Sequence, residues 1–311
     1  MSLSQDLPTA IRAPALSGAP SELTPAWTGA LELTADEFQR VARLIYAAAG
    51  IALPPGKEGL VRARLGPRLR QHGLSSVTEY LAFVEGDRSG QERVRLVDVL
   101  TTNKTSFFRE AEHFHFLGTT VLPALEARWR SGRAAARIWS AGCSSGEEPY
   151  TIAMVLREQL GAEHAAAARV LATDISTRVL DRARAATYTT ETLADVPRDL
   201  AGRHFRRAAT AGAGPQGPPG ERPHEVVAAT RALVRFARLN LMGDWPMRGP
   251  FDVIFCRNVM IYFDRPTQER LVQRFASLLA PGGYLLVGHS ESLTALSHPL
   301  DYVQPAVYVK R

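Results

Sequence analysis

Apolar residues recur with helical spacing in the first third of the chain, beginning just after residue 30. Thr34 and Glu37 form the pattern of a capping box, and they precede an apolar stripe that runs from Phe38 to Ile45 and ends at Gly50. The same spacing predicts further helices at 57–71, 76–85 and 90–100. Together these helices predict a small all-helical domain over residues 31–100.

Beyond residue 110, short apolar runs alternate with helical patterns. A helix at 111–130 is followed by strands predicted at 136–141, 169–173, 233–238, 251–255 and 283–288, with helices at 147–160, 176–185, 197–205 and 266–279. This alternation is typical of an α/β domain with a parallel sheet covered by helices on both faces, here residues 111–311.

Three segments lack regular patterning. Residues 1–30 are rich in Pro, Ser, Thr and Ala, which predicts a disordered tail. Residues 101–110 link the two predicted domains. The Gly, Pro and Ala residues of 208–223 predict a flexible excursion within the α/β domain.

The segment 137–150 predicts a buried strand, a glycine turn and a helix start, as in a Rossmann-like fold. A dinucleotide site has three glycines that let the backbone approach a pyrophosphate. Here only Gly142 and Gly146 are present, and the two acids that follow, Glu147 and Glu148, would repel a phosphate. This combination indicates a cationic or zwitterionic ligand with a ribose and no phosphate, such as S-adenosylmethionine.

Composition narrows the class of protein. A chain of 311 residues that is 45% hydrophobic can form two domains with their own cores. No run of 18 apolar residues and no secretory signal occurs, and the two cysteines fall in predicted buried segments, so we expect a cytoplasmic protein with neither a disulfide framework nor a metal site. The net charge of +6 favours an acidic partner, which could be a nucleic acid, a membrane surface or an acidic protein.

Four long motifs occur in an order that is typical of one family. They occupy residues 101–110, 146–150, 172–175 and 255–264, and Gly288-His-Ser-Glu291 follows near the C-terminus. From about residue 34 to its end, the chain resembles the CheR family, the chemotaxis receptor glutamate O-methyltransferases. The resemblance implies a helical domain, a linker and an S-adenosylmethionine-binding α/β domain with a small antiparallel β subdomain inserted around residues 203–237.

Methyl transfer from a sulfonium to an ionised carboxylate needs no general base, so we expect the site to position the reactants and exclude water. Asp174, at the end of a predicted strand, is expected to accept the ribose hydroxyls, although it could instead cap the next helix. Glu148 resembles the family acid that meets the charged methionine end of the cofactor. Glu147 remains the alternative.

The resemblance also assigns roles to the linker. It implies that Asn103, Thr105 and Arg109 contact the cofactor or the substrate. A guanidinium at Arg109 could hold a carboxylate through two hydrogen bonds, and an interdomain salt bridge is the alternative.

A second group of expected site residues follows later strands. Asn258 and Val259 resemble family residues near the adenine and the transferred methyl group, and Tyr262 is expected to face the sulfonium. A core aromatic is the alternative for Tyr262. Asn240 and Leu241 resemble a pair at the adenine edge.

The sequence signal for a substrate-binding surface is less specific than the signal for the cofactor site. Arg64, Arg68 and Arg70 lie on one predicted helix without a neighbouring acid, and they resemble the family surface for acidic receptor helices. An ordinary solvated arginine face is the alternative, and Pro67 is expected to kink this helix. Some family members bind a C-terminal receptor pentapeptide by adding a strand to the inserted subdomain, and whether this chain does so is open.

Three functions therefore remain. We expect a monomeric enzyme that methylates glutamates on the cytoplasmic domain of methyl-accepting chemotaxis receptors, for adaptation in a chemosensory pathway. A methyltransferase with another substrate is the second possibility, but the chain lacks an Asn/Asp-Pro-Pro-aromatic motif for a flipped base, which argues against nucleic acid. The third is a binding module that holds the cofactor without turnover.

Overall fold

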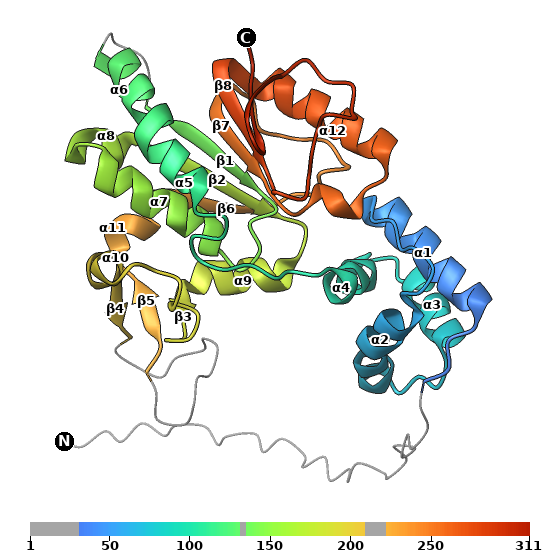
Figure 1. Cartoon of the computed structure of the whole chain (residues 1–311). Coiled ribbons are helices and arrows are strands. Elements are labelled where there is room, and N and C mark those ends of the chain that lie inside the picture. The colour runs from blue at the N-terminus through green and yellow to red at the C-terminus, as the bar shows by residue number, and fades with distance from the viewer. Residues whose placement is uncertain (1–30, 131–134, 209–221) are drawn as a thin grey trace, which may run out of the picture.

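The computed structural model describes residues 31–130, 135–208 and 222–311 (Figure 1). The predicted disordered tail, residues 1–30, lies outside this range, as does most of the predicted excursion at 208–223. The N-terminal domain consists of α1 (Ala35–Ala49), α2 (Glu58–His72), α3 (Val77–Gly86) and α4 (Gln91–Leu100). These helices share one apolar core, in which Val41, Ile45, Val61, Leu65 and Leu81 are fully buried.

The predicted capping box at the start of α1 is confirmed. The Glu37 backbone N–H donates to Thr34 Oγ1 at 3.2 Å, and the Thr34 N–H donates to Glu37 Oε2 at 2.9 Å. The second carboxylate oxygen of Glu37 accepts from the backbone N–H and the hydroxyl of Thr78, at 3.0 and 2.8 Å. The cap therefore also joins the start of α1 to α3.

The C-terminal domain is built on a mixed sheet in the order β6-β2-β1-β7-β8-β10-β9. The first five of these strands are parallel, namely β6 (Val234–Arg238), β2 (Arg169–Asp174), β1 (Arg137–Ala141), β7 (Phe251–Cys256) and β8 (Leu279–Val287). The expectation of an all-parallel sheet is wrong at one edge. There, β9 (Asp301–Gln304) and β10 (Val307–Val309) form a hairpin, and β10 is antiparallel to β8.

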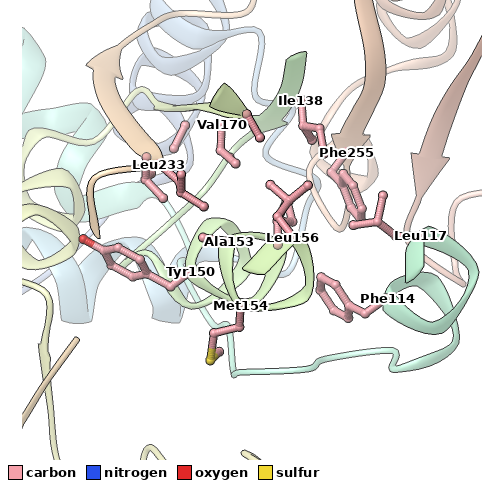
Figure 2. Close-up of a cluster of buried hydrophobic side chains, with 14 of the residues drawn as sticks. Phe114, Leu117, Ile138, Tyr150, Ala153, Met154, Leu156, Val170, Leu233 and Phe255 are labelled. Carbon is pink, nitrogen blue, oxygen red and sulfur yellow. The ribbon is translucent and has the colours of Figure 1, made fainter. Parts of the chain in front are cut away.

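Helices cover both faces of the sheet, as expected. Side chains alternate along each strand, so that Ile138, Val253 and Phe255 face one apolar cluster while Trp139 and Ile254 face another. The first cluster includes residues of α5 (Glu112–Phe116), α6 (Leu122–Arg130) and α7 (Glu147–Gln159), as Figure 2 shows for part of it. The second includes residues of α12 (Arg265–Leu278).

Local departures from the predicted helices are small. The helix expected at 111–130 is divided by a π-helical turn, Leu117–Val121, into α5 and α6. A short helix that was not predicted, α8 (Ala162–Ala167), follows α7, and α9 (Thr177–Ala185) follows β2. A 3-10 turn, η2 (Met260–Tyr262), follows β7.

The inserted subdomain is a second, three-stranded antiparallel sheet in the order β3-β5-β4. It contains β3 (Thr187–Tyr188), β4 (Phe205–Arg207) and β5 (His224–Val226), with α10 (Arg198–His204) and α11 (Ala228–Arg231) beside it. The expected range of 203–237 omits β3 and extends into β6, which belongs to the main sheet. The boundary was misplaced because β3 has only two residues and gives no strand pattern in the sequence.

The turn between β1 and α7 depends on Gly142, which has a φ of +89°. A Cβ atom at this position would lie 2.4 Å from Val259 Cγ2, so the turn and the loop after β7 leave no room for a side chain. Gly56 has nearly the same φ, +90°, but a Cβ there would meet no atom within 4 Å.

These two glycines allow the steric contact to be measured separately from backbone strain. We expect Gly56→Ala to lower the free energy of unfolding by about 1–2 kcal/mol, the cost of a left-handed residue. Gly142→Ala should lower it by about 1–3 kcal/mol more, because Val259 must also move. Chemical denaturation of both variants would test this, and equal losses would contradict the role given to the Val259 contact.

Candidate functional site

A cavity of about 240 Å³ lies between the helical domain, the linker and the carboxyl ends of the central strands. Its wall includes every residue that was predicted for the cofactor and the reaction: Asn103, Thr105, Arg109, Glu148, Asp174, Asn240, Leu241, Asn258, Val259 and Tyr262. The structure thus gathers side chains from five separate parts of the chain in one place.

Asp174 ends β2 and is buried at the cavity wall. Its Oδ2 accepts from the Ser144 backbone N–H at 2.9 Å, and its Oδ1 accepts from the Ser176 N–H at 2.9 Å. Burial raises the pKa of Asp174, although these backbone hydrogen bonds oppose the increase. Ser176, not Asp174, caps α9, so the alternative role for Asp174 is wrong.

The two acids after Gly146 have different surroundings. Glu148 lines the cavity, accepts from Ser140 Oγ at 2.6 Å and lies 3.4 Å from Arg257 Nη1. Glu147 does not line the cavity, and its carboxylate accepts from Ser145 Oγ instead. Burial raises the pKa of Glu148, while Arg257 lowers it in part. The geometry favours Glu148 over Glu147 as the acid that faces a ligand.

Arg257 was not selected from the sequence, yet its buried guanidinium connects most of the site. It lies 3.2 Å from Glu110 Oε2 and 3.4 Å from Glu148 Oε2, and it donates to the backbone carbonyl of Arg109. It also lies over the Phe114 ring, 5.2 Å from the centroid. The available signal was an arginine placed directly after the apolar strand Phe251–Cys256.

The linker approaches the cavity with unusual backbone geometry. Phe108 and Glu110 both have positive φ values, 52° and 57°. Between them, Arg109 is half-buried and donates to the Lys104 carbonyl at 2.8 Å, and no acid of the described residues is hydrogen-bonded to it. The alternative of an interdomain salt bridge for Arg109 is therefore not supported. Phe107 is fully buried against Tyr188 and Phe205 of the inserted sheet.

The loop after β7 is held by Glu291, a second residue that sequence reasoning missed. Its carboxylate accepts from the backbone N–H groups of Gly288 and Asn258 at 2.7 Å each, and from that of Ile261 at 3.1 Å. Asn258 has a φ of 58°, and these bonds stabilise that conformation. The motif at 288–291 therefore positions Asn258 and Val259 at the cavity.

Asn240 lines the cavity, but its amide already has partners in the protein. Its Nδ2 donates to the Ala48 carbonyl at 2.8 Å, and its Oδ1 accepts from the Met242 N–H at 3.0 Å. The amide thus joins the segment after β6 to the end of α1, and it keeps a second N–H and a second lone pair that face no partner in these two bonds. Leu241 offers an apolar surface to the same cavity.

Tyr262 is partly exposed and lines the cavity, so the alternative of a core aromatic is wrong. Its hydroxyl lies 3.5 Å from the Thr102 carbonyl, at the limit of a hydrogen bond. The backbone carbonyl of Tyr262 accepts from the Ala52 N–H at 2.9 Å, which connects η2 to the helical domain.

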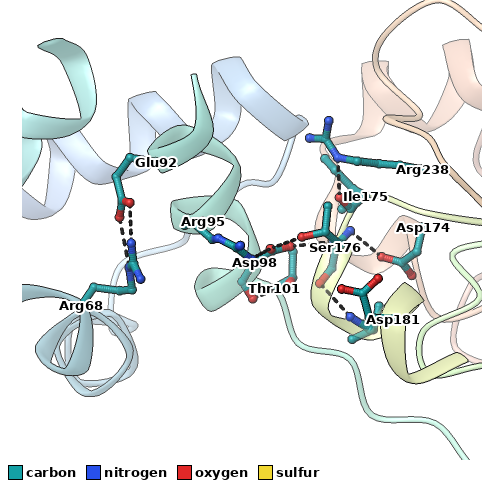
Figure 3. Close-up of polar contacts among 12 residues, drawn as sticks. Arg68, Glu92, Arg95, Asp98, Thr101, Asp174, Ile175, Ser176, Asp181 and Arg238 are labelled. Atoms are coloured by element: carbon teal, nitrogen blue, oxygen red, sulfur yellow. Dashed lines mark hydrogen bonds and ion pairs between the residues drawn. The ribbon is translucent and has the colours of Figure 1, made fainter. Parts of the chain in front are cut away.

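Two of the three arginines expected at a substrate surface serve internal contacts. Arg64 donates to the carbonyls of Leu100 and Thr101 at 2.7 and 3.0 Å, and to Thr102 Oγ1 at 2.9 Å. Arg68 forms an ion pair with buried Glu92 inside the helical domain (Figure 3).

The expectation that Arg64 and Arg68 face a partner is therefore wrong, because long arginine side chains turn back onto their own domain. Arg70 and Arg62 are exposed on α2, and no side-chain hydrogen bond joins them to the described part of the chain. Pro67 is also exposed, and α2 continues through it, so the proline does not end the helix.

Both domains also contact each other beside the cavity. Asp98, at the end of α4, accepts from the backbone N–H and the hydroxyl of Thr177 at 3.1 and 2.8 Å. Asp98 thereby satisfies a free N–H at the start of α9.

Among the helices of the described residues, none has both the length and the apolar character needed to cross a membrane. Both cysteines, Cys143 and Cys256, are free and buried.

Comparison with known proteins is consistent with this arrangement. Residues 36–101 match the family model described as "CheR methyltransferase, all-alpha domain", and residues 103–309 match "CheR methyltransferase, SAM binding domain". A chemotaxis protein methyltransferase of Klebsiella aerogenes is 43% identical over 89% of this chain and 90% of its own length. Those of Escherichia coli and Borreliella burgdorferi are 41% and 39% identical, each over 90% of this chain and over 93% and 96% of their own lengths. The chain belongs to the CheR methyltransferase family.

Proposed function

We propose that this protein transfers a methyl group from S-adenosylmethionine to glutamate side chains on the cytoplasmic domain of chemotaxis receptors. The observation that carries the proposal is the single cavity that joins Asp174, Glu148, Arg109 and Tyr262. The products are a glutamyl methyl ester and S-adenosylhomocysteine. The named chemotaxis methyltransferases that match most of the chain support the same reaction.

The residues of the cavity fit a cationic cofactor that has a ribose and no phosphate. Asp174 would accept the two ribose hydroxyls, since its carboxylate oxygens can accept further hydrogen bonds besides those from the backbone. Glu148 would accept from the α-amino group of the methionine end. Leu241 and Val259 supply apolar surface on the same wall.

The bound cofactor supplies an activated methyl group with a neutral thioether as leaving group. The substrate glutamate is ionised at neutral pH, so no residue has to remove a proton. Arg109 would hold the incoming carboxylate through its guanidinium, whose only nearby acid among the described residues that acts on it electrostatically is Glu148. Tyr262 would place its ring and hydroxyl beside the reacting atoms. Positioning and exclusion of water account for the catalysis.

The partner surface is part of the proposal. Exposed Arg62 and Arg70 on α2 would meet the acidic helices of a receptor. In the inserted sheet, β4 is an edge strand with exposed Arg206 and Arg207, and it could add a strand from a receptor C-terminal pentapeptide. The protein would act as a monomer in the cytoplasm.

The proposed reaction can be tested with S-adenosylmethionine labelled in its methyl group and membranes that carry the host's own chemoreceptors. Label on receptor bands that mild alkali releases as methanol would establish a carboxyl methyl ester. Alkali-stable label would indicate another acceptor atom. No label, with cofactor binding intact by calorimetry, would favour a binding module.

Arg109→Ala should reduce receptor methylation at least about 100-fold, because the acceptor carboxylate loses its charged partner. The fold should persist, since the Arg109 side chain makes only one hydrogen bond, to Lys104. Initial rates and far-UV circular dichroism would check both statements, with Arg88→Ala, at an exposed site between α3 and α4, as the control. Normal turnover by Arg109→Ala would remove this assignment.

Substitution of Arg64 should weaken cofactor binding and not receptor binding. Arg64→Ala removes three hydrogen bonds to residues 100–102, so we expect S-adenosylhomocysteine to bind about ten-fold more weakly, or about 1.4 kcal/mol. Arg62→Ala, on the same helix but exposed, is the matched control. Calorimetry would measure the affinity of both variants for S-adenosylhomocysteine. Unchanged affinity in Arg64→Ala would refute the role of Arg64 in holding the linker at the cofactor site.

Substitution of exposed Arg62 and Arg70 should weaken receptor binding and not cofactor binding. The double variant Arg62→Glu/Arg70→Glu should raise KM for receptor about ten-fold, because the two introduced glutamates would repel the acidic receptor helices. Its affinity for S-adenosylhomocysteine should stay unchanged. Arg88→Glu/Arg93→Glu changes the net charge equally on another exposed face. Equal effects of the two double variants would point to overall charge and away from α2.

A further inference from the structure

Glu110, His113 and His289 form a cluster next to the cofactor cavity but outside its wall. One ligand atom from each residue lies within 4.8 Å of the others. His113 Nδ1 is 3.5 Å from Glu110 Oε2, and the rings of His113 and His289 are 5.0 Å apart between centroids. The cluster joins the linker and the start of α5 to the loop after β8.

His113 is an independent indication of a ligand. Its side chain is 1% exposed, and neither Nδ1 nor Nε2 has a hydrogen-bond partner. Buried polar groups almost always have a partner, because an unsatisfied donor or acceptor is costly in an apolar interior. A neutral imidazole without a partner retains a lone pair that can bind a metal ion.

The surrounding charge is compatible with a cation. Arg257 lies 3.2 Å from Glu110 and is the positive group that competes for that carboxylate. Its charge is shared with Glu148, at 3.4 Å, so Glu110 is not its only acidic partner, and Arg109 also acts on Glu148. The backbone N–H of His289 also donates to Glu110 Oε2, at 3.3 Å. The other oxygen of Glu110 accepts from Asn258 Nδ2, at 3.3 Å.

We propose that Glu110, His113 and His289 bind one divalent transition-metal ion of the zinc type. Two imidazole nitrogens and one carboxylate oxygen are a common donor set for such ions, and a water would complete the coordination on the side of His289, which is exposed. The ion would connect the linker residue next to Arg109 to the motif that holds Asn258. Occupancy would therefore stabilise the linker against the sheet, whichever substrate accepts the methyl group.

The test uses the full chain without an affinity tag, stripped of metal with a chelator, and Zn²⁺ in calorimetry. We expect one tight site per chain, and His289→Ala should weaken its affinity at least about ten-fold. His115→Ala, exposed on α5 and outside the cluster, is the control and should bind as the parent protein does. Co²⁺ should give the visible absorption of a low-coordinate nitrogen site, and His289→Ala should abolish it.

His289 is exposed, so its substitution should leave the fold intact, and thermal unfolding without metal checks this. His113→Gln provides a second variant within the cluster. The proposal is overturned if Zn²⁺ binds only at millimolar concentration. It is also overturned if His289→Ala and His115→Ala bind Zn²⁺ as tightly as the parent, because the ion would then be adventitious.

Discussion

The guanidinium of Arg257 is the group on which the geometry of the site depends. It is buried between two carboxylates, Glu110 and Glu148, and it also binds the backbone of Arg109. A buried charge is tolerated only with close partners, so each of these groups fixes the position of the others. One side chain thus connects the end of β7, the first turn of α7 and the linker.

The linker is held from both sides. Arg64 binds the backbone at residues 100–101 from the helical domain, and Ser144 Oγ donates to the Asn103 carbonyl at 2.8 Å from the sheet domain. Asp98 and Asn240 add hydrogen bonds between the two domains. The cavity exists because these contacts hold the helical domain over the ends of the strands.

Local signals in the sequence predicted most of the fold. The capping box at Thr34, the glycine turn at Gly142 and the alternating apolar runs each correspond to an observed element. The C-terminal hairpin was missed because β9 is short and largely exposed, with Tyr302 facing solvent, and gives no apolar alternation. The inserted sheet was misplaced because β3 has only two residues.

The residues expected at the cofactor all line one cavity, whereas the contacts of several side chains differ from those expected. Family motifs located the wall of the cavity, but a motif does not show where a long side chain ends. Arg64 and Arg68 therefore appeared to be surface residues, although both turn inward. The Glu110, His113 and His289 cluster gave no spacing signal, because its members lie at two distant places in the sequence and only folding brings them together.

The most direct test of this account is a crystal structure of the protein with S-adenosylhomocysteine. The account predicts that the ribose hydroxyls bind Asp174, that the α-amino group lies at Glu148, and that the linker stays paired with Arg257 over the ligand. A ligand bound outside this cavity, or a linker that leaves Arg257 when the ligand is present, would contradict it.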